Sequence, residues 1–349
     1  MKENTTSSNL LSSLSIWWFA FGYFACYVPY SATTKALSKG WFPGLETPLQ
    51  GASILPISVM TSAVAMLAFI TAMGWWKHAS RRDVAGKSVP MPGKWTFLSG
   101  LGTAAVILTT TLAYTFSGIS IVFAMLLMRG GVLILAPIVD GMSGRRVKWF
   151  SWIALVLSLA ALVVAFAEDG GYTITTIAAI DIGIYLSSYF LRLRLMSRLA
   201  KSEDESANLR YFVEEQMVAA PSLLIALALF AFLGSGPFAA ALHVGFTEFW
   251  GTALFLPLAG VGLLSQGTGI FGGLILLSKE ENTFCVPVNR SSSILAGVMA
   301  SVSLAFFFGA PPLSTYQLAG AALIIAAIVF LTLPTLMKRN QPLPASQRQ

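Results

Sequence analysis

The chain has 349 residues, of which 56% are apolar and only 11% are charged, and its mean hydropathy is +0.73. Soluble domains are about 45–50% apolar and about 25% charged, so this composition excludes an ordinary soluble protein and indicates a polytopic membrane protein. The formal charge of +7 comes from lysines and arginines that lie between hydrophobic segments, where they orient a membrane chain, and we expect no nucleic-acid partner.

Ten hydrophobic segments are each long enough to cross a hydrocarbon core of about 30 Å, which takes roughly 20 helical residues. They lie within residues 14–36, 50–75, 96–117, 119–141, 149–167, 173–195, 212–234, 251–277, 283–308 and 315–337. No A-x-A-like cleavage site closes the first segment, so we expect a retained helix rather than a signal peptide. The sequence therefore predicts an all-α integral membrane protein with ten transmembrane helices.

Basic residues alternate from one connection to the next. Lysines and arginines gather at residues 77–94, 145–148 and 192–210, whereas the connections after the third, fifth, seventh and ninth segments contain none. The positive-inside rule then places both termini, the tails at residues 1–11 and 339–349, in the cytoplasm. We expect a multi-pass protein of the cell membrane, with the lipid bilayer as its surroundings.

Two parts of the chain repeat one another weakly. The stretch SGLGTAAV, with Gly100 and Gly102, aligns with AGVGLLSQ, with Gly260 and Gly262. After a shift of one residue, MRGGVLILA aligns with NRSSSILAG, which pairs Arg129 with Arg290. Five helices per half is an odd number, so the second half must cross the membrane in the opposite sense. The sequence predicts two inverted five-helix repeats, at residues 12–168 and 172–338.

This organisation resembles a known family of carriers. The first segment ends in a lysine (VPYSATTKAL, Lys35), and a short basic turn and a small-residue-rich fifth segment follow the fourth. The pattern resembles the drug/metabolite transporter superfamily, with its EamA-like members. Residues 125–168 are similar to the fourth and fifth helices of its nucleotide-sugar-transporter-like and chloroquine-resistance-transporter-like branches. Bacterial members usually carry a glutamate after the fourth helix, where this chain has SGRRVK. The resemblance implies a transporter fold but no particular substrate.

Arg129 and Arg290 are the strongest candidates for a binding site. A charge at mid-membrane costs about 2.5–3.5 kcal/mol on insertion scales, so such residues face the bundle interior and usually serve a function. Matching positions in inverted repeats can converge on one central site, and the planar guanidinium suits a carboxylate or phosphate. The alternative is that each arginine ties helices together through backbone carbonyls or an acid such as Asp181.

Other charged residues allow two interpretations each. Lys35 can contact substrate or snorkel to the headgroups, and Asp181 can carry a coupling proton, balance Arg129 or pair helices. Glu214 can close a gate with Arg210 or Arg194. A solvated helix start is the interpretation we favour for Glu214 and its neighbour Glu215.

Further candidates are polar side chains and one charge cluster. Gln266 lies among glycines in the eighth segment, Tyr114 follows three threonines in the third, and Tyr30 follows Pro29 in the first. Such residues line a cavity or simply bond to a neighbouring helix. We expect Asp140, Arg145 and Arg146 to form an interfacial charge cluster. The candidate substrate-binding residues are Arg129, Arg290, Lys35, Gln266, Tyr30 and Tyr114, and the candidate coupling or gating residues are Asp181 and Glu214.

No catalytic or metal-binding pattern is visible in the sequence. Cys26 and Cys285 lie far apart in hydrophobic segments, and the two histidines, His78 and His243, lie outside the segments. We therefore expect no enzyme, metal or cofactor. The sequence predicts a secondary transporter of a small, anionic organic metabolite, working by alternating access with a coupling ion or exchanged solute. A lipid-phosphate flippase and a non-transporting membrane protein are the alternatives, and the sequence does not indicate an oligomeric state.

Overall fold

The computed structural model describes residues 16–42, 45, 47–84, 86–116, 121–167, 175–201, 204–280 and 282–339. The expected N-terminal tail at residues 1–11 and the expected boundary between the two halves at residues 168–172 lie outside the described residues, and so does the expected C-terminal tail at 339–349 except for Arg339, which ends α12.

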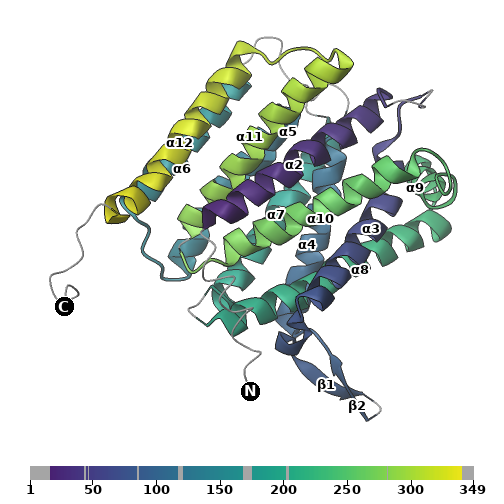
Figure 1. The fold of residues 1–349 in the computed structure, drawn as a ribbon, viewed down its shortest axis with the longest axis horizontal. Helices are drawn as coiled ribbons and strands as arrows, with labels where there is room; N and C mark the ends of the chain where they lie inside the picture. Colours follow the sequence, from purple (N-terminus) through teal and green to yellow (C-terminus); the bar gives the residue numbers. More distant parts are fainter. Residues whose placement is uncertain are drawn as a thin grey trace.

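Helices make up nearly all of the described structure (Figure 1). They are α2 (Ile16–Lys39), α3 (Gly51–Ala72), α4 (Lys94–Ala113), α5 (Ile121–Met142), α6 (Trp149–Phe166), α7 (Thr176–Leu199), α8 (Glu205–Leu233), α9 (Pro237–Thr247), α10 (Phe255–Leu277), α11 (Asn282–Phe308) and α12 (Thr315–Arg339). A short 3₁₀ helix, Trp75–His78, and a hairpin of strands β1 (Arg81–Val84) and β2 (Lys87–Pro90) connect α3 to α4.

Six helices in the described residues are long and apolar enough to cross a membrane, namely α3, α4, α7, α8, α10 and α11. Large apolar side chains point outward, among them Phe306, Leu233 and Val163, each more than two-thirds exposed. Polar and charged side chains such as Arg129 and Glu215 are instead buried. An apolar exterior around a polar interior, with six such helices, fits a multi-pass membrane protein.

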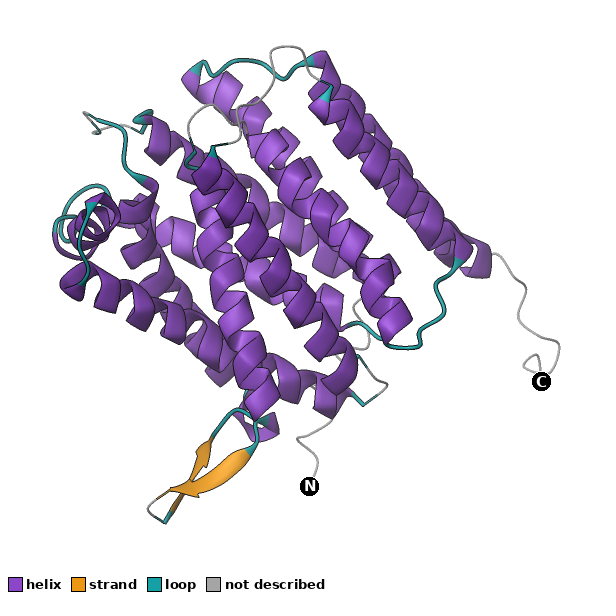
Figure 2. Ribbon diagram, turned by 180° about the vertical axis from the view of Figure 1, so that it is seen from behind, coloured by secondary structure: helices purple, strands orange, loops and turns teal. Residues whose placement is uncertain are grey.

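The helices pack in a continuous bundle. α2 packs against α10 and α11, α4 packs against α7 and α8, and α3 contacts α8, α9 and α10. α5 packs on α11, and α6 packs on α12 at one edge of the molecule (Figures 1 and 2). These contacts place α2, α4, α5, α7, α10 and α11 around the centre of the bundle.

Two glycines let helix backbones approach closely. A Cβ atom at Gly100 of α4 would lie 2.6 Å from Cβ of Val218 in α8. A Cβ atom at Gly262 of α10 would lie 2.1 Å from the carbonyl oxygen of Ser58 in α3. Both contacts are too short for any larger residue, so glycine fixes the packing of α4 on α8 and of α10 on α3.

The structure differs from the sequence-based expectation in several places, one of which is α9, a helix in the connection expected after the seventh segment. α7 continues to Leu199, so Arg192, which the sequence analysis counted with the basic residues of a connection, lies well inside a helix. α8 begins at Glu205, two turns before the expected start at residue 212. The β1–β2 hairpin also departs from a purely helical chain. Its two-residue loop contains Gly86 with φ +77°, a conformation that suits glycine in hairpin turns.

Candidate functional site

Arg129 and Arg290 face the same central cavity. Arg129 projects from α5 and Arg290 from α11, and only 2% and 1% of their surfaces are exposed. The cavity leaves about 70 Å³ for the centres of water-sized molecules, which is room for several waters. Its lining also includes Tyr23, Tyr27, Tyr30, Ser62, Thr103, Val106, Ile107, Thr110, Tyr189, Arg192, Gln216, Ser265, Gln266, Thr268, Gly269, Gly272 and Gly273.

One tyrosine joins the two arginines. Nη1 of Arg129 and Nη1 of Arg290 both donate to the phenol oxygen of Tyr185, the second at 2.8 Å. The guanidinium of Arg129 also lies over the Tyr185 ring, 5.1 Å from its centre. Tyr185 belongs to α7 and is fully buried, so this hydroxyl lies at the meeting point of three helices.

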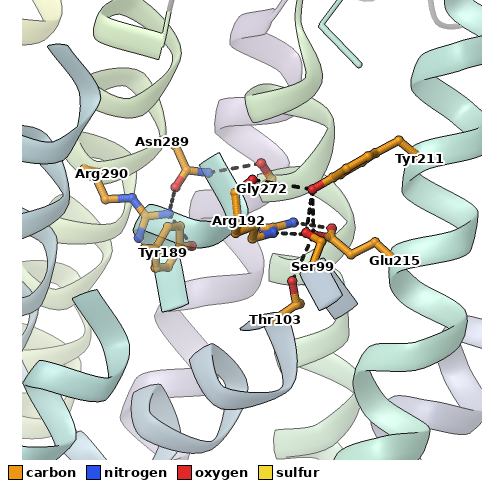
Figure 3. A network of polar contacts seen from close by, with 9 residues as sticks. All are labelled: Ser99, Thr103, Tyr189, Arg192, Tyr211, Glu215, Gly272, Asn289 and Arg290. Carbon is orange, nitrogen blue, oxygen red and sulfur yellow. Dashed lines mark hydrogen bonds and ion pairs between the residues drawn. The ribbon is translucent and has the colours of Figure 1, made fainter. Parts of the chain in front are cut away.

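Further tyrosines surround each guanidinium. Nη2 of Arg129 donates to the hydroxyls of Tyr27 and Tyr114, which are themselves 2.6 Å apart. Nη2 of Arg290 donates to Tyr189 at 2.9 Å and to Oδ1 of Asn289 (Figure 3). Hydroxyls and ring faces solvate a cation, but they supply no full negative charge.

The two arginines lack a carboxylate partner within the described part of the chain. Neither forms an ion pair there, and Nε of each is a buried donor without a protein hydrogen-bond partner. A buried, uncompensated charge is costly, and two of the same sign also repel each other. The cavity is therefore cationic and holds spare donors, which is the electrostatic complement of an anion.

The third arginine of the cavity, Arg192, is neutralised. Its Nε and Nη2 each lie 2.8 Å from a carboxylate oxygen of Glu215, a bidentate pair that joins α7 to α8 (Figure 3). Oε1 of Glu215 also accepts from Ser99 at 2.7 Å, from Thr103 at 3.0 Å and from Tyr211 at 3.3 Å. Ser99 and Thr103 belong to α4, so this network ties α4, α7 and α8 together.

The expectation of a solvated helix start at Glu214 and Glu215 is wrong. Both are buried, because α8 begins about two turns earlier than expected and carries them into the bundle. Glu214 does not contact Arg210 or Arg194 in any described ion pair. It accepts from the backbone of Ser80 and Gly93, each at 3.0 Å, and from the Thr96 hydroxyl at 2.6 Å.

Asp140 is also not part of an interfacial charge cluster. It is fully buried and accepts four hydrogen bonds from the backbone and side chains of Asn282 and Thr283. It therefore satisfies the free N–H groups at the start of α11, where a negative charge is favourable. Arg145 instead donates to the carbonyl oxygens of Lys201 and Lys279.

The other predicted site residues are only partly brought together. Tyr30 and Gln266 line the cavity; Tyr30 is 2.8 Å from the Thr111 hydroxyl, and Gln266 accepts from Ser62 at 2.7 Å. Tyr114 does not line the cavity, but its hydroxyl accepts a hydrogen bond from Arg129, which does. Lys35 and Asp181 do not line the cavity.

Lys35 lies near the end of α2, where it donates to the carbonyl of Phe116 at 3.4 Å. Asp181 lies one helical turn before Tyr185, and its Oδ2 is buried without a hydrogen-bond partner among the described residues.

Sequence reasoning missed Tyr185, Tyr189 and the Arg192–Glu215 pair. Tyr185, Tyr189 and Arg192 follow Asp181 at helical spacing, so one face of α7 carries all of them. That spacing was a usable signal. The common face of α7 was overlooked because Arg192 was counted with the basic residues of a connection.

Comparison with known proteins bears on the fold alone. No family model matches the chain, and no curated protein matches it. A solved structure described only as a crystal structure of a protein is similar over 92% of this chain and 96% of its own length. The TM-score is 0.52 and the identity is 13%, so the likeness extends to the fold and to no substrate or activity.

Proposed function

We propose that the chain is a secondary transporter of a small organic metabolite that carries an anionic group. The observation that carries this proposal is the pair of buried arginines, Arg129 and Arg290, in one cavity without a carboxylate partner in the described residues. A bound carboxylate or phosphate would supply the missing charge and accept from the spare N–H groups. Arg192, paired with Glu215, would not compete for the same anion.

We further propose ten spans in two inverted halves, as in the drug/metabolite transporter superfamily that the sequence resembles. We match α2, α3, α4, α5 and α6, in this order, with α7, α8, α10, α11 and α12. The main helix contacts of the first half then recur between the matching helices of the second half. α2 packs on α10 as α7 packs on α4, and α3 packs on α10 as α8 packs on α4. α5 and α11, like α6 and α12, pack on their own counterparts. This symmetry supports the repeat, and Arg129 and Arg290 occupy matching places in it.

Transport by this proposal requires the cavity to change size. The cavity volume of about 70 Å³ is below the roughly 300–1,000 Å³ of typical ligand pockets. A metabolite would need the helices around Arg129 and Arg290 to separate. Rocking of the two halves around the central site would provide that movement and would expose the site to each side in turn.

The Arg192–Glu215 pair is our candidate for the inner gate. Arg192 lines the central cavity, and Tyr211, which contacts Glu215, lines a second cavity of about 190 Å³ at the end of α7 and the start of α4. The pair and its bonds to Ser99 and Thr103 therefore lie between two cavities. Opening this path would require the pair to separate and become hydrated.

The proposed activity is tested with purified protein in liposomes, offered pools of phosphorylated and carboxylated metabolites. We expect saturable uptake or exchange of at least one anion, lost in Arg129→Ala and kept in Arg146→Ala, whose arginine is exposed. A parallel assay of fluorescent phospholipid movement separates a solute carrier from a flippase. Lipid movement without uptake of any anion would overturn the proposal.

The gate is tested by labelling a cysteine inside the cavity. In a chain with serine at positions 26 and 285, Ser265→Cys places a thiol in the cavity lining. Glu215→Gln should speed labelling by a water-soluble reagent about tenfold or more, because a hydrogen bond to a charged group is worth about 1.5–3 kcal/mol. Lys148→Gln, which breaks the exposed 2.7 Å pair with Glu280, is the matched control and should change nothing. Equal rates in both variants would contradict the gate.

A further inference from the structure

The β1–β2 hairpin has two chemically different faces. Its antiparallel register pairs Arg82 with Val89 and Arg81 with Pro90, and directly paired residues share a face. One face, called here the basic face, carries Arg82, Lys87 and Val89. The opposite face, called here the mixed face, carries Arg81, Asp83, Ser88 and Pro90. The basic face thus combines two cations with an apolar side chain, and the mixed face carries an acid.

A buried carboxylate holds the base of the hairpin. Glu214 of α8 accepts from the backbone N–H of Ser80, just before β1, and of Gly93, just after β2. Met91 donates to the Ser80 carbonyl at 2.8 Å and extends the pairing of the two strands. Glu214 therefore fixes how the hairpin leaves the bundle. This role differs from the two that the sequence suggested, a gate and a solvated helix start.

The hairpin extends sideways from the bundle and does not continue the direction of α3 or α8 (Figures 1 and 2). In a membrane whose normal follows the helices, such a hairpin lies along the surface. Val89 and Met91 are 42% and 41% exposed, and Trp95, at the start of α4, is 53% exposed. Exposed apolar and indole side chains beside lysine and arginine are typical of the membrane interface.

We propose that the basic face of the hairpin docks on anionic lipid headgroups of the cytoplasmic leaflet. The inference rests on the proposed orientation, with residues 77–94 in the cytoplasm, and not on the transported substrate. The cytoplasmic leaflet is negatively charged, so it attracts Arg82 and Lys87, while Val89 enters the boundary between headgroups and acyl chains. Asp83 makes the mixed face a poor match for the same surface.

Labels on the two faces test this proposal. A fluorophore is attached to Val89→Cys on the basic face or to Ser88→Cys on the mixed face, with serine at positions 26 and 285. The full chain is placed in nanodiscs of phosphatidylcholine with or without phosphatidylglycerol, and headgroup-nitroxide lipid quenches any label at the surface. We expect strong quenching at Val89→Cys that depends on phosphatidylglycerol and weakens with salt, and weak quenching at Ser88→Cys.

Charge variants give the matched controls. Neutralising Arg82 and Lys87 together to glutamine should lower the ratio of docked to free hairpin roughly 30-fold. Arg81→Gln removes one positive charge from the mixed face and should leave quenching unchanged, whereas Arg82→Gln alone should already lower it. Equal quenching of both labels, no dependence on phosphatidylglycerol, or an equal effect of Arg81→Gln would overturn the proposal. Anion uptake in liposomes tests the transporter independently of this outcome.

Discussion

Arg129 and Arg290 donate to the same atom, the phenol oxygen of Tyr185, although they lie 161 positions apart in the chain, one on α5 and one on α11. Two like charges brought to one oxygen repel each other, and hydroxyls alone compensate them incompletely. An anionic oxygen in the cavity would relieve this repulsion. The shared contact is therefore the physical basis of the proposed binding site.

Tyr185→Phe should weaken anion binding more than Tyr189→Phe. The first change removes an acceptor from both guanidiniums, whereas Tyr189 accepts only from Arg290. Hydrogen bonds to charged groups are worth about 1.5–3 kcal/mol, so we expect roughly tenfold to hundredfold weaker binding for Tyr185→Phe. Titration of the anion that the liposome screen identifies measures the difference. Equal affinities of the two variants would speak against the shared contact.

Glu214→Ala should destabilise the fold without changing anion affinity. The carboxylate accepts from Ser80, Gly93 and Thr96 and does not line the central cavity. Leaving these donors unpaired should cost about 1–3 kcal/mol, seen as a lower unfolding temperature in detergent. Glu205→Ala, an exposed acid in the first turn of the same helix, is the control and should have little effect. A large loss of affinity in folded Glu214→Ala would return this residue to the transport pathway.

Lys201 should make stability depend on alkaline pH. It lies between α7 and α8 with 4% exposure, and burial lowers the pKa of its ammonium below the usual value. As pH rises from that lowered pKa toward about 10.4, the unfolded chain still binds the proton that the folded chain has lost, so stability rises. Thermal unfolding across this range should show the gain in the wild type and not in Lys201→Met. The same pH dependence in both would contradict the prediction.

Membrane orientation can be measured with single cysteines. A cysteine at Lys87, in the hairpin, should be shielded from an impermeant reagent outside intact cells, and one at His243, in α9, should react. Both positions are exposed, whereas Ala239 in the same helix is only 3% exposed and would label poorly. The serine-substituted chain without Cys26 and Cys285 is the background. Labelling of Lys87→Cys from outside would reverse the orientation.

The sequence was informative where hydrophobicity alone determines structure. Long apolar segments predict helices at the places where the structure has them, and an arginine inside an apolar segment predicts a buried one, as with Arg129 and Arg290. The ends of helices were predicted less accurately where polar residues lie inside the helices, as at the end of α7 and the start of α8. Arg192 was assigned to a connection because basic residues are typical there, and its buried partner Glu215 is far from it in the sequence.

The sequence could not predict which polar residues meet. Asp140 and Glu214 both look like interfacial acids, but each accepts backbone N–H groups at the start of another helix, α11 or α4. Those helix starts lie far from the acids along the chain, so only the packing of α5 on α11 and of α8 on α4 brings them together. The role of Tyr185 could not be predicted for the same reason, because it depends on two arginines from other helices.

Substrate affinity of folded, detergent-purified Arg129 variants tests the central claim most directly. Removing the arginine should leave the substrate charge without its partner and cost about 2–5 kcal/mol, roughly 30-fold to several thousand-fold in affinity. Arg129→Lys should fall between Arg129→Ala and the wild type, because it keeps the charge and loses the bidentate geometry. Arg290→Ala should behave similarly and not add to Arg129→Ala, since both arginines hold one group. Near-normal affinity in folded Arg129→Ala, with only a lower unfolding temperature, would contradict anion binding and leave the arginine a purely structural role.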